Sequence, residues 1–213
     1  MRSERLTRAR LAHAAALLAR RDPALGRVVA RHGPPPMWGR PPGFATLVGI
    51  ILEQQVSLAS GRAGFARLRT VAGEVTASRI AALRPDDLRR AGLTRQKAAY
   101  IHGLALAIRD GAFDHARLAR LGDDEVRAAL IALRGIGPWS ADIYLLMALR
   151  RADAWPSGDL ALAIAAREVL RLRAIPNTVA LARIAERWRP WRAVAARILW
   201  QHYLGRVAAR AGR

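Results

Sequence analysis

The stretch LRGIGPWSADIYLLMALRRADAWPSGDLAL, from Leu133 to Leu162, predicts the centre of the fold. It opens with the turn Gly135-Ile136-Gly137, where glycine allows backbone angles that a Cβ atom forbids. Pro138 suits the first turn of the apolar helix that follows, because its missing N–H needs no partner there. After a short loop, Asp159 stands where a further helix begins. We therefore predict a helical hairpin over roughly residues 123–150 and a helix that starts at Asp159.

The rest of the chain also has the hydrophobic period of helices, and no segment alternates as a strand would. Residues 44–55, FATLVGIILEQQ, are apolar around most of a helical circumference, which predicts a central buried helix. The proline-rich stretch 33–43 cannot be helical. A helix–glycine–helix pattern at Leu88–Ile101 repeats the one at Leu130–Tyr144, which favours stacked helical hairpins. The predicted fold is all-α, with two helical lobes in one domain over residues 1–213.

The charge of the chain indicates a polyanionic partner. It has 36 basic and 16 acidic residues, a formal net charge of +20. Lys97 is the only lysine, and a GC-rich genome would explain this preference for arginine. Codon bias does not explain the excess of bases over acids, however, so nucleic acid is the leading partner.

Several classes of protein are excluded or disfavoured by composition. The absence of cysteine excludes disulfides, thiolate zinc sites and iron–sulfur clusters. The five histidines form no close ligand pair, so we expect neither metal nor cofactor. The basic N-terminus lacks a signal-peptide core, and Glu4 favours an ordinary first helix over a mitochondrial presequence. No segment is apolar enough to cross a bilayer, so we expect a cytoplasmic protein, nucleoid-associated if bacterial, with no membrane partner.

The glycine turn has two interpretations. The N–H groups of the first helical turn and the positive end of the helix dipole suit a phosphate oxygen, with Arg134 beside them. Alternatively, Gly-x-Gly-Pro forms a simple corner between two helices. The residues of the turn alone leave both open.

Flanking motifs carry a family resemblance. The run Leu133–Ala141, with its L-x-G-I-G-x-W-S-A pattern, resembles the helix–hairpin–helix element of base-excision DNA glycosylases. Gly158-Asp159, ILEQQVS at Ile51–Ser57 and WRPWRAVAARILW at Trp188–Trp200 resemble further blocks of the HhH-GPD superfamily, in its 3-methyladenine DNA glycosylase II (AlkA-like) branch. The resemblance covers roughly Phe44 to Tyr203. It implies a helix–hairpin–helix glycosylase fold with an active-site cleft between the lobes, acting as a monomer on double-stranded DNA with damaged bases. The first forty or so residues are too short for the β-rich N-terminal domain of some members.

The resemblance places Asp159 at the catalytic position, although an Asp at a helix start is ordinarily an N-cap. Cleavage of an N-glycosidic bond leaves positive charge on the sugar, which a carboxylate stabilises while it orients the attacking water. An alkylated purine is already cationic and leaves without a second acid. Asp142 and Asp153 are weaker candidates, and we expect Asp142 to orient backbone or arginine groups.

Trp139 stands where bifunctional members of the family carry the lysine that forms a Schiff base with the sugar. The sole lysine, Lys97, lies in the other predicted hairpin, where a phosphate contact is expected. The resemblance therefore implies a monofunctional enzyme that leaves an abasic site.

The base-binding pocket implied by the resemblance contains Trp139 and Trp200, whose faces would attract a cationic purine by about 0.5–2 kcal/mol. Ile143 occupies the position of a pocket tyrosine in some relatives, with Tyr144 next to it. Helically spaced tryptophans are otherwise core residues, which is the interpretation we prefer for Trp188 and Trp191.

Gln54 and Gln55 leave the buried helix where relatives insert a residue into DNA, and Gln55 is the favoured one. Polar capping of a helix exit is the alternative. Three functions thus stay open: an alkylated-purine glycosylase, which leads; a non-catalytic helix–hairpin–helix DNA-binding protein; and an oxidised-base glycosylase with lyase activity.

Overall fold

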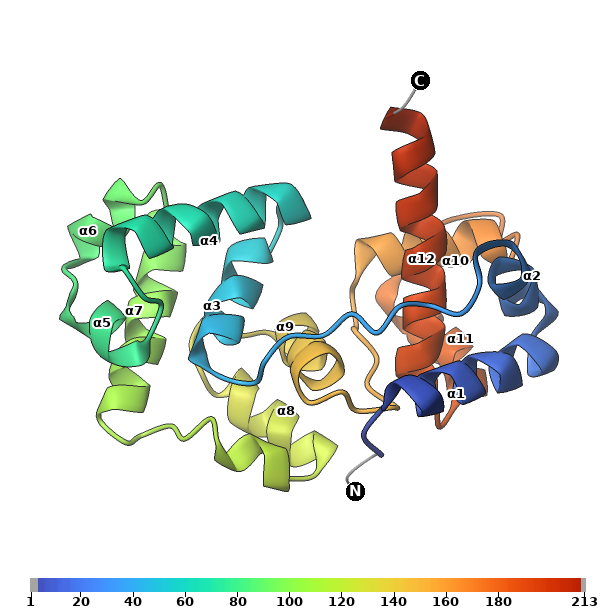
Figure 1. The fold of residues 1–213 in the computed structure, drawn as a ribbon, viewed down its shortest axis with the longest axis horizontal. Coiled ribbons are helices and arrows are strands. Elements are labelled where there is room, and N and C mark those ends of the chain that lie inside the picture. The colour runs from blue at the N-terminus through green and yellow to red at the C-terminus, as the bar shows by residue number, and fades with distance from the viewer. Residues whose placement is uncertain (1–3, 212–213) are drawn as a thin grey trace. The chain divides into compact units, whose positions relative to one another are not determined.

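The computed structural model describes residues 4–211, which form twelve α-helices and no strand (Figure 1). The chain divides into two compact units. Unit 1 combines the residues up to Gly39 with those from Leu145 onward, and unit 2 is the continuous segment Arg40–Tyr144. The predicted all-α fold is confirmed.

Unit 1 contains five α-helices and a short 3₁₀ turn. They are α1 (Arg8–Arg21), α2 (Pro23–His32), α10 (Leu160–Val169), α11 (Thr178–Ala185), η3 (Glu186–Trp188) and α12 (Arg192–Ala211). Asp22 caps α2 ahead of its first-turn proline: its Oδ1 accepts from Ala24 N at 3.0 Å. Helix α12, drawn in red in Figure 1, packs against α10, α2 and α1.

The core of unit 1 includes two large side chains, Trp188 and Arg197, that donate hydrogen bonds from within it. Trp188 is fully buried, and its Nε1 donates to Asp22 Oδ2 at 2.8 Å, so its predicted core role is confirmed. Trp191 is only half-buried. Arg197 on α12 is fully buried and donates to the carbonyl oxygens of Trp38 (2.6 Å) and Leu146 (3.1 Å). Burial and the neighbouring charge of Arg150 lower the pKa of Arg197 to about 10.

Unit 2 contains seven α-helices and one 3₁₀ turn. They are α3 (Phe44–Glu53), α4 (Leu58–Ala72), α5 (Ala77–Ala82), α6 (Pro85–Arg90), α7 (Arg95–Arg109), η1 (Arg117–Arg120), α8 (Asp123–Ile131) and α9 (Pro138–Ile143). Helix α3 packs against α4, α7 and α9, and eight of its ten residues are buried. Its prediction as a central buried helix is therefore confirmed. The exposed strip of α3 is made by its small residues Ala45 and Gly49.

The two predicted helical hairpins are present as α6–α7 and α8–α9. The turn of each holds a glycine at positive φ, Gly92 at 75° and Gly135 at 91°. Thr94 caps α7, since its Oγ1 accepts from Lys97 N at 3.2 Å. The repeated sequence pattern thus corresponds to a repeated backbone turn.

The helix after the glycine turn differs from the prediction. A single apolar helix is expected from the sequence, but α9 ends at Ile143 and the chain continues as a π-helix over Tyr144–Ala148. π-Helices are rare and leave the regular i→i−4 bonding pattern. Within this one, Arg197 supplies the donor for the Leu146 carbonyl, and Leu145 O accepts from Arg151 N at 3.0 Å.

Candidate active site

Asp159 caps α10, and its alternative interpretation as an N-cap is correct. Its Oδ1 accepts from Leu162 N at 2.8 Å, with backbone angles of φ −70° and ψ 113°. Gly158 before it adopts a φ of 80°, which reverses the chain immediately ahead of the helix. The carboxylate is half-buried and fixed at the positive end of the α10 dipole.

Trp200 reaches the same carboxylate from α12. Its Nε1 donates to Asp159 Oδ1 at 3.2 Å, and only 8% of the side chain is exposed. Two predicted site residues, 41 positions apart in the chain, are therefore in direct contact in unit 1. Two N–H donors on one oxygen, from Leu162 and Trp200, hold the carboxylate in a single orientation.

The turn between α8 and α9 in unit 2 contains two glycines, Gly135 and Gly137, and the structure requires glycine only at position 135. A Cβ on Gly135 would lie 2.2 Å from Tyr100 Cγ, and its φ is 91°. Gly137 instead has extended angles, φ −96° and ψ 179°, and a Cβ there would meet no atom within 4 Å. The expectation that both glycines adopt backbone angles forbidden to other residues is thus wrong for Gly137. Its backbone conformation is one that a residue with a side chain can adopt.

Gln54 supports the hairpin from the end of α3. Its Nε2 donates to Gly135 O at 2.8 Å and to Ser140 Oγ at 2.9 Å. Gln55 beside it is exposed and adopts a φ of 59°, which is uncommon for a residue with a side chain. The sequence does not distinguish the two glutamines, but in the structure Gln54 contacts the hairpin and Gln55 is exposed to solvent.

Lys97 on α7 is bonded to the C-terminal end of α3. Its Nζ donates to Leu52 O at 2.8 Å and to Gln54 O at 3.0 Å. Partial burial lowers the pKa of Lys97 from its ordinary value. Two of its three N–H groups thus satisfy carbonyls that the helix end leaves unpaired.

The other predicted pocket residues differ in exposure. Trp139 is half-buried, while Ile143 is 5% and Tyr144 0% exposed. The Tyr144 hydroxyl accepts from Gly43 N at 3.0 Å, and burial raises the pKa of Tyr144. Tyr144 therefore supports the start of α3, and its predicted contact with a base stays a prediction.

The two weaker carboxylate candidates bind arginines. Asp142 is buried and accepts from Arg127 Nε at 2.7 Å, as expected. Asp153 accepts from Arg192 Nε at 3.0 Å and also pairs with Arg189. Arg134 beside the glycine turn is exposed.

Sequence reasoning missed Tyr100 and Ser140, which shape the hairpin through Gly135 and Gln54 respectively. No local pattern marks either residue, because each acts on a partner distant in sequence. Among residues 4–211, no His, Asp and Glu side chains are grouped as a metal site requires, and no helix has the length and apolarity to span a membrane.

Known proteins resemble this chain in sequence and in structure. The DNA-3-methyladenine glycosylase of Bacillus subtilis is 31% identical over 123 residues, which is 58% of this chain and 41% of that protein. DNA-3-methyladenine glycosylase 1 of Schizosaccharomyces pombe is 26% identical over 162 residues, 74% of this chain and 71% of that protein. The chain spans about two fifths of the length of the first curated relatives it matches.

A solved structure shares the fold. It is the 3-methyladenine DNA glycosylase of Schizosaccharomyces pombe in complex with abasic DNA, with a TM-score of 0.81 and 24% identity, covering 89% of this chain and 95% of that chain. Residues 48–196 match the model of the HhH-GPD superfamily of base excision DNA repair proteins, and this range contains the hairpin, Asp159 and most of α3. The chain therefore belongs to the HhH-GPD superfamily of base excision DNA repair proteins.

Proposed function

We propose that this chain is a monofunctional DNA glycosylase that hydrolyses the N-glycosidic bond of alkylated purines, 3-methyladenine among them, and leaves an abasic site. The observation that carries the proposal is the Asp159 carboxylate, held by Leu162 N and by the indole N–H of Trp200. An aromatic ring and an oriented carboxylate are the two groups this reaction needs together. Relatives named as 3-methyladenine glycosylases support the substrate class.

In the proposed reaction, Asp159 stabilises the positive charge that develops on the sugar as the base leaves. Because the carboxylate is already held in one orientation, the site needs less reorganisation to reach the transition state. The same carboxylate orients the attacking water. Since an alkylated purine is already cationic, no second carboxyl group has to protonate it.

Trp200 would stack the flipped base next to Asp159, and Trp139, Ile143 and Tyr144 are further proposed contacts of the base. A base must leave the duplex before its glycosidic bond can be reached. The bond from Trp200 to Asp159 fixes the plane of the indole ring and links base recognition to the catalytic carboxylate. Electron-rich indole faces favour a cationic purine over a neutral one.

Two positions support hydrolysis without lyase chemistry: the one where bifunctional relatives carry the Schiff-base lysine, and the one that holds the sole lysine of this chain. Trp139 occupies the position after the glycine turn, and a tryptophan cannot form a Schiff base. Lys97 is engaged with the carbonyls of Leu52 and Gln54. Borohydride trapping of a covalent adduct with DNA would instead support the oxidised-base glycosylase and lyase.

Contacts to double-stranded DNA would come from the hairpin backbone at Gly135, Ile136 and Gly137, from Arg134 and from Lys97, with Gln55 entering the duplex. The exposed position and unusual φ of Gln55 support this choice over Gln54, which is bonded to the hairpin. Gln54 would then act on DNA through the hairpin that it holds. We propose a monomer in which both units form one catalytic domain.

The test is Asp159→Asn. Asparagine caps a helix as well as aspartate, so α10 should remain folded while the negative charge is lost. We expect release of 3-methyladenine from methylated DNA, measured by mass spectrometry of free bases, to fall by about a hundredfold or more. Duplex binding should survive. Undiminished base release would refute the proposed role, and an inactive wild-type chain that binds DNA would favour the non-catalytic module.

A further inference from the structure

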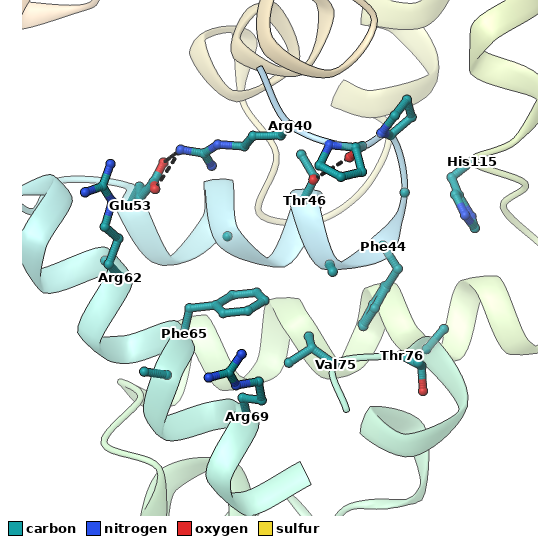
Figure 2. A pocket seen from close by; sticks show the side chains of 18 residues that line it. Arg40, Phe44, Thr46, Glu53, Arg62, Phe65, Arg69, Val75, Thr76 and His115 are labelled. Carbon is teal, nitrogen blue, oxygen red and sulfur yellow. Dashed lines mark hydrogen bonds and ion pairs between the residues drawn. The ribbon is translucent and has the colours of Figure 1, made fainter. Parts of the chain in front are cut away.

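A pocket of about 800 Å³ lies within unit 2 and contains none of the residues proposed for base excision. It is bordered by α3, α4 and the chain around Thr76 and His115 (Figure 2). Its size falls within the usual range for sites that bind small molecules, roughly 300–1,000 Å³. The pocket is therefore large enough for a ligand that the proposed reaction does not use.

The floor of this pocket is apolar and made by small residues facing an aromatic one. Ala45 and Gly49 lie on one face of α3 at a spacing of four residues, opposite Phe65 of α4. A Cβ on Gly49 would lie 3.9 Å from Phe65 Cδ2, so the phenyl ring borders the space that a side chain would fill. Phe65 is half-buried, and Figure 2 shows its ring directed toward α3. A flat apolar body suits this surface.

The charged groups of the pocket have an excess of positive charge. Arg40 is neutralised by Glu53, to which it donates at 2.8 Å on both carboxylate oxygens. Arg62 and Arg69 also line the pocket and are exposed, and no carboxylate among residues 4–211 pairs with either. Seven residues apart on α4, they stand about 10 Å apart along the helix and flank Phe65. Two unpaired guanidinium groups beside an aromatic ring suit a phosphate.

We propose that this pocket binds a flat aromatic anion of mononucleotide size, with its ring against Phe65 and its phosphate bound by Arg62 and Arg69. His115 borders the end near Gly43 and gives that end a polar group. A free mononucleotide and the terminal nucleotide of a DNA strand share this chemistry. The site is independent of Asp159 and of the proposed glycosylase reaction.

The ligand test is calorimetric titration of the full chain with deoxyadenosine 5′-monophosphate. Two partial ligands, deoxyadenosine and inorganic phosphate, separate the ring from the charge. We expect each to bind at least about tenfold more weakly than the nucleotide, because each forms only one of the two contacts. The 5′-phosphorylated trinucleotide of deoxyadenosine distinguishes the sources: binding as tight as that of the mononucleotide indicates a strand end, and weaker binding indicates a free nucleotide.

The variant test compares two double substitutions that remove the same charge. Arg62→Ala with Arg69→Ala should weaken nucleotide binding by about tenfold or more. Arg84→Ala with Arg120→Ala, at exposed positions of unit 2 outside the pocket, should change it less than about twofold. Ala45→Leu should place a branched side chain on the surface proposed for the ring and abolish binding while the helical circular dichroism is kept, since leucine is a good helix former.

Three results would overturn the proposal. The first is no detectable binding of the nucleotide at millimolar concentration. The second is an equal loss in both arginine double variants, which would indicate non-specific attraction to a basic surface. The third is full binding by Ala45→Leu and by the Arg62 and Arg69 double variant, which would place the nucleotide elsewhere on the protein.

Discussion

Substituting Gly135 with alanine should destabilise the protein far more than the same change at Gly137. The two glycines flank one residue in the same turn, so sequence alone makes them equivalent. In the structure Gly135 has a φ of 91° and Gly137 a φ of −96°. The added methyl group would therefore strain the backbone only at residue 135.

The expected cost at Gly135 has two parts. A residue with a Cβ in the left-handed region costs about 1–2 kcal/mol. The Cβ would also lie 2.2 Å from Tyr100 Cγ and 2.7 Å from Tyr100 Cβ, and rotation of the Tyr100 side chain about its own bonds cannot move its Cβ. The hydroxyl of Tyr100 also accepts from Gln96 Nε2 at 2.7 Å, which holds the ring. Overpacking of this kind costs about 1–3 kcal/mol, so the total is about 2–5 kcal/mol.

Urea unfolding of Gly135→Ala and Gly137→Ala, followed by circular dichroism, measures this difference. Gly137→Ala should change the free energy of unfolding by less than about 1 kcal/mol, because its site is open and extended. Tyr100→Gly, which removes both Cβ and Cγ of residue 100, then separates the two parts: in that background Gly135→Ala should cost only the backbone strain, about 1–2 kcal/mol. If Gly135→Ala costs no more than Gly137→Ala, the argument from φ and from Tyr100 is wrong.

Three further predictions concern the cap, a buried tyrosine and salt. Asp159→Ala should lower the free energy of unfolding by about 1 kcal/mol through loss of the bond to Leu162 N, and Asp159→Asn should lower it by clearly less. Equal melting temperatures of the wild type and Asp159→Ala would contradict the capping role. Tyr144→Phe should cost about 1–3 kcal/mol at pH 8, because Gly43 N–H loses its acceptor. Burial raises the pKa of Tyr144 in the folded protein. The stability that Tyr144 contributes is therefore complete below its pKa in the unfolded chain, about 10, and is lost as pH rises through its pKa in the folded protein. Over that alkaline range the phenylalanine variant should lose less stability than the wild type, and urea titrations at two pH values can check this. Duplex affinity should fall by about 0.9 log units per phosphate contact for each tenfold rise in salt, and Arg134→Ala should reduce that slope by about one contact, whereas an unchanged slope would remove Arg134 from the interface.

The helices could be predicted because their signals are local. Asp22, Thr94 and Asp159 each bond to a backbone N–H two or three residues ahead, so the capping residue and the helix it starts are adjacent in sequence. The apolar period of residues 44–55 likewise identifies α3. The six residues of α5 are too few for such a period, and nothing local distinguishes a π-helix from an α-helix.

The partners within the site could not be predicted, because they are distant in sequence. Gln54 and Gly135 are 81 positions apart, and Tyr144 and Gly43 are 101 apart. Motif resemblance indicated that Gln54, Tyr144 and Trp200 belong to the site region, but not which atoms they contact. Gln54 and Tyr144 therefore have supporting contacts that their residue types did not indicate.

The hydrogen bond between Tyr144 and Gly43 has a consequence for how the polypeptide is made. It joins the last residue of unit 2 to one near its first, so the chain enters and leaves this unit at neighbouring points, as an inserted module does. Such a segment can close and fold on the ribosome as soon as Tyr144 has emerged. Unit 1 cannot, because α1 and α2 must wait for α10 and α12, which are synthesised after unit 2. Asp159 and Trp200 belong to that later-completed unit, so their contact forms only after the whole of unit 2 has been synthesised.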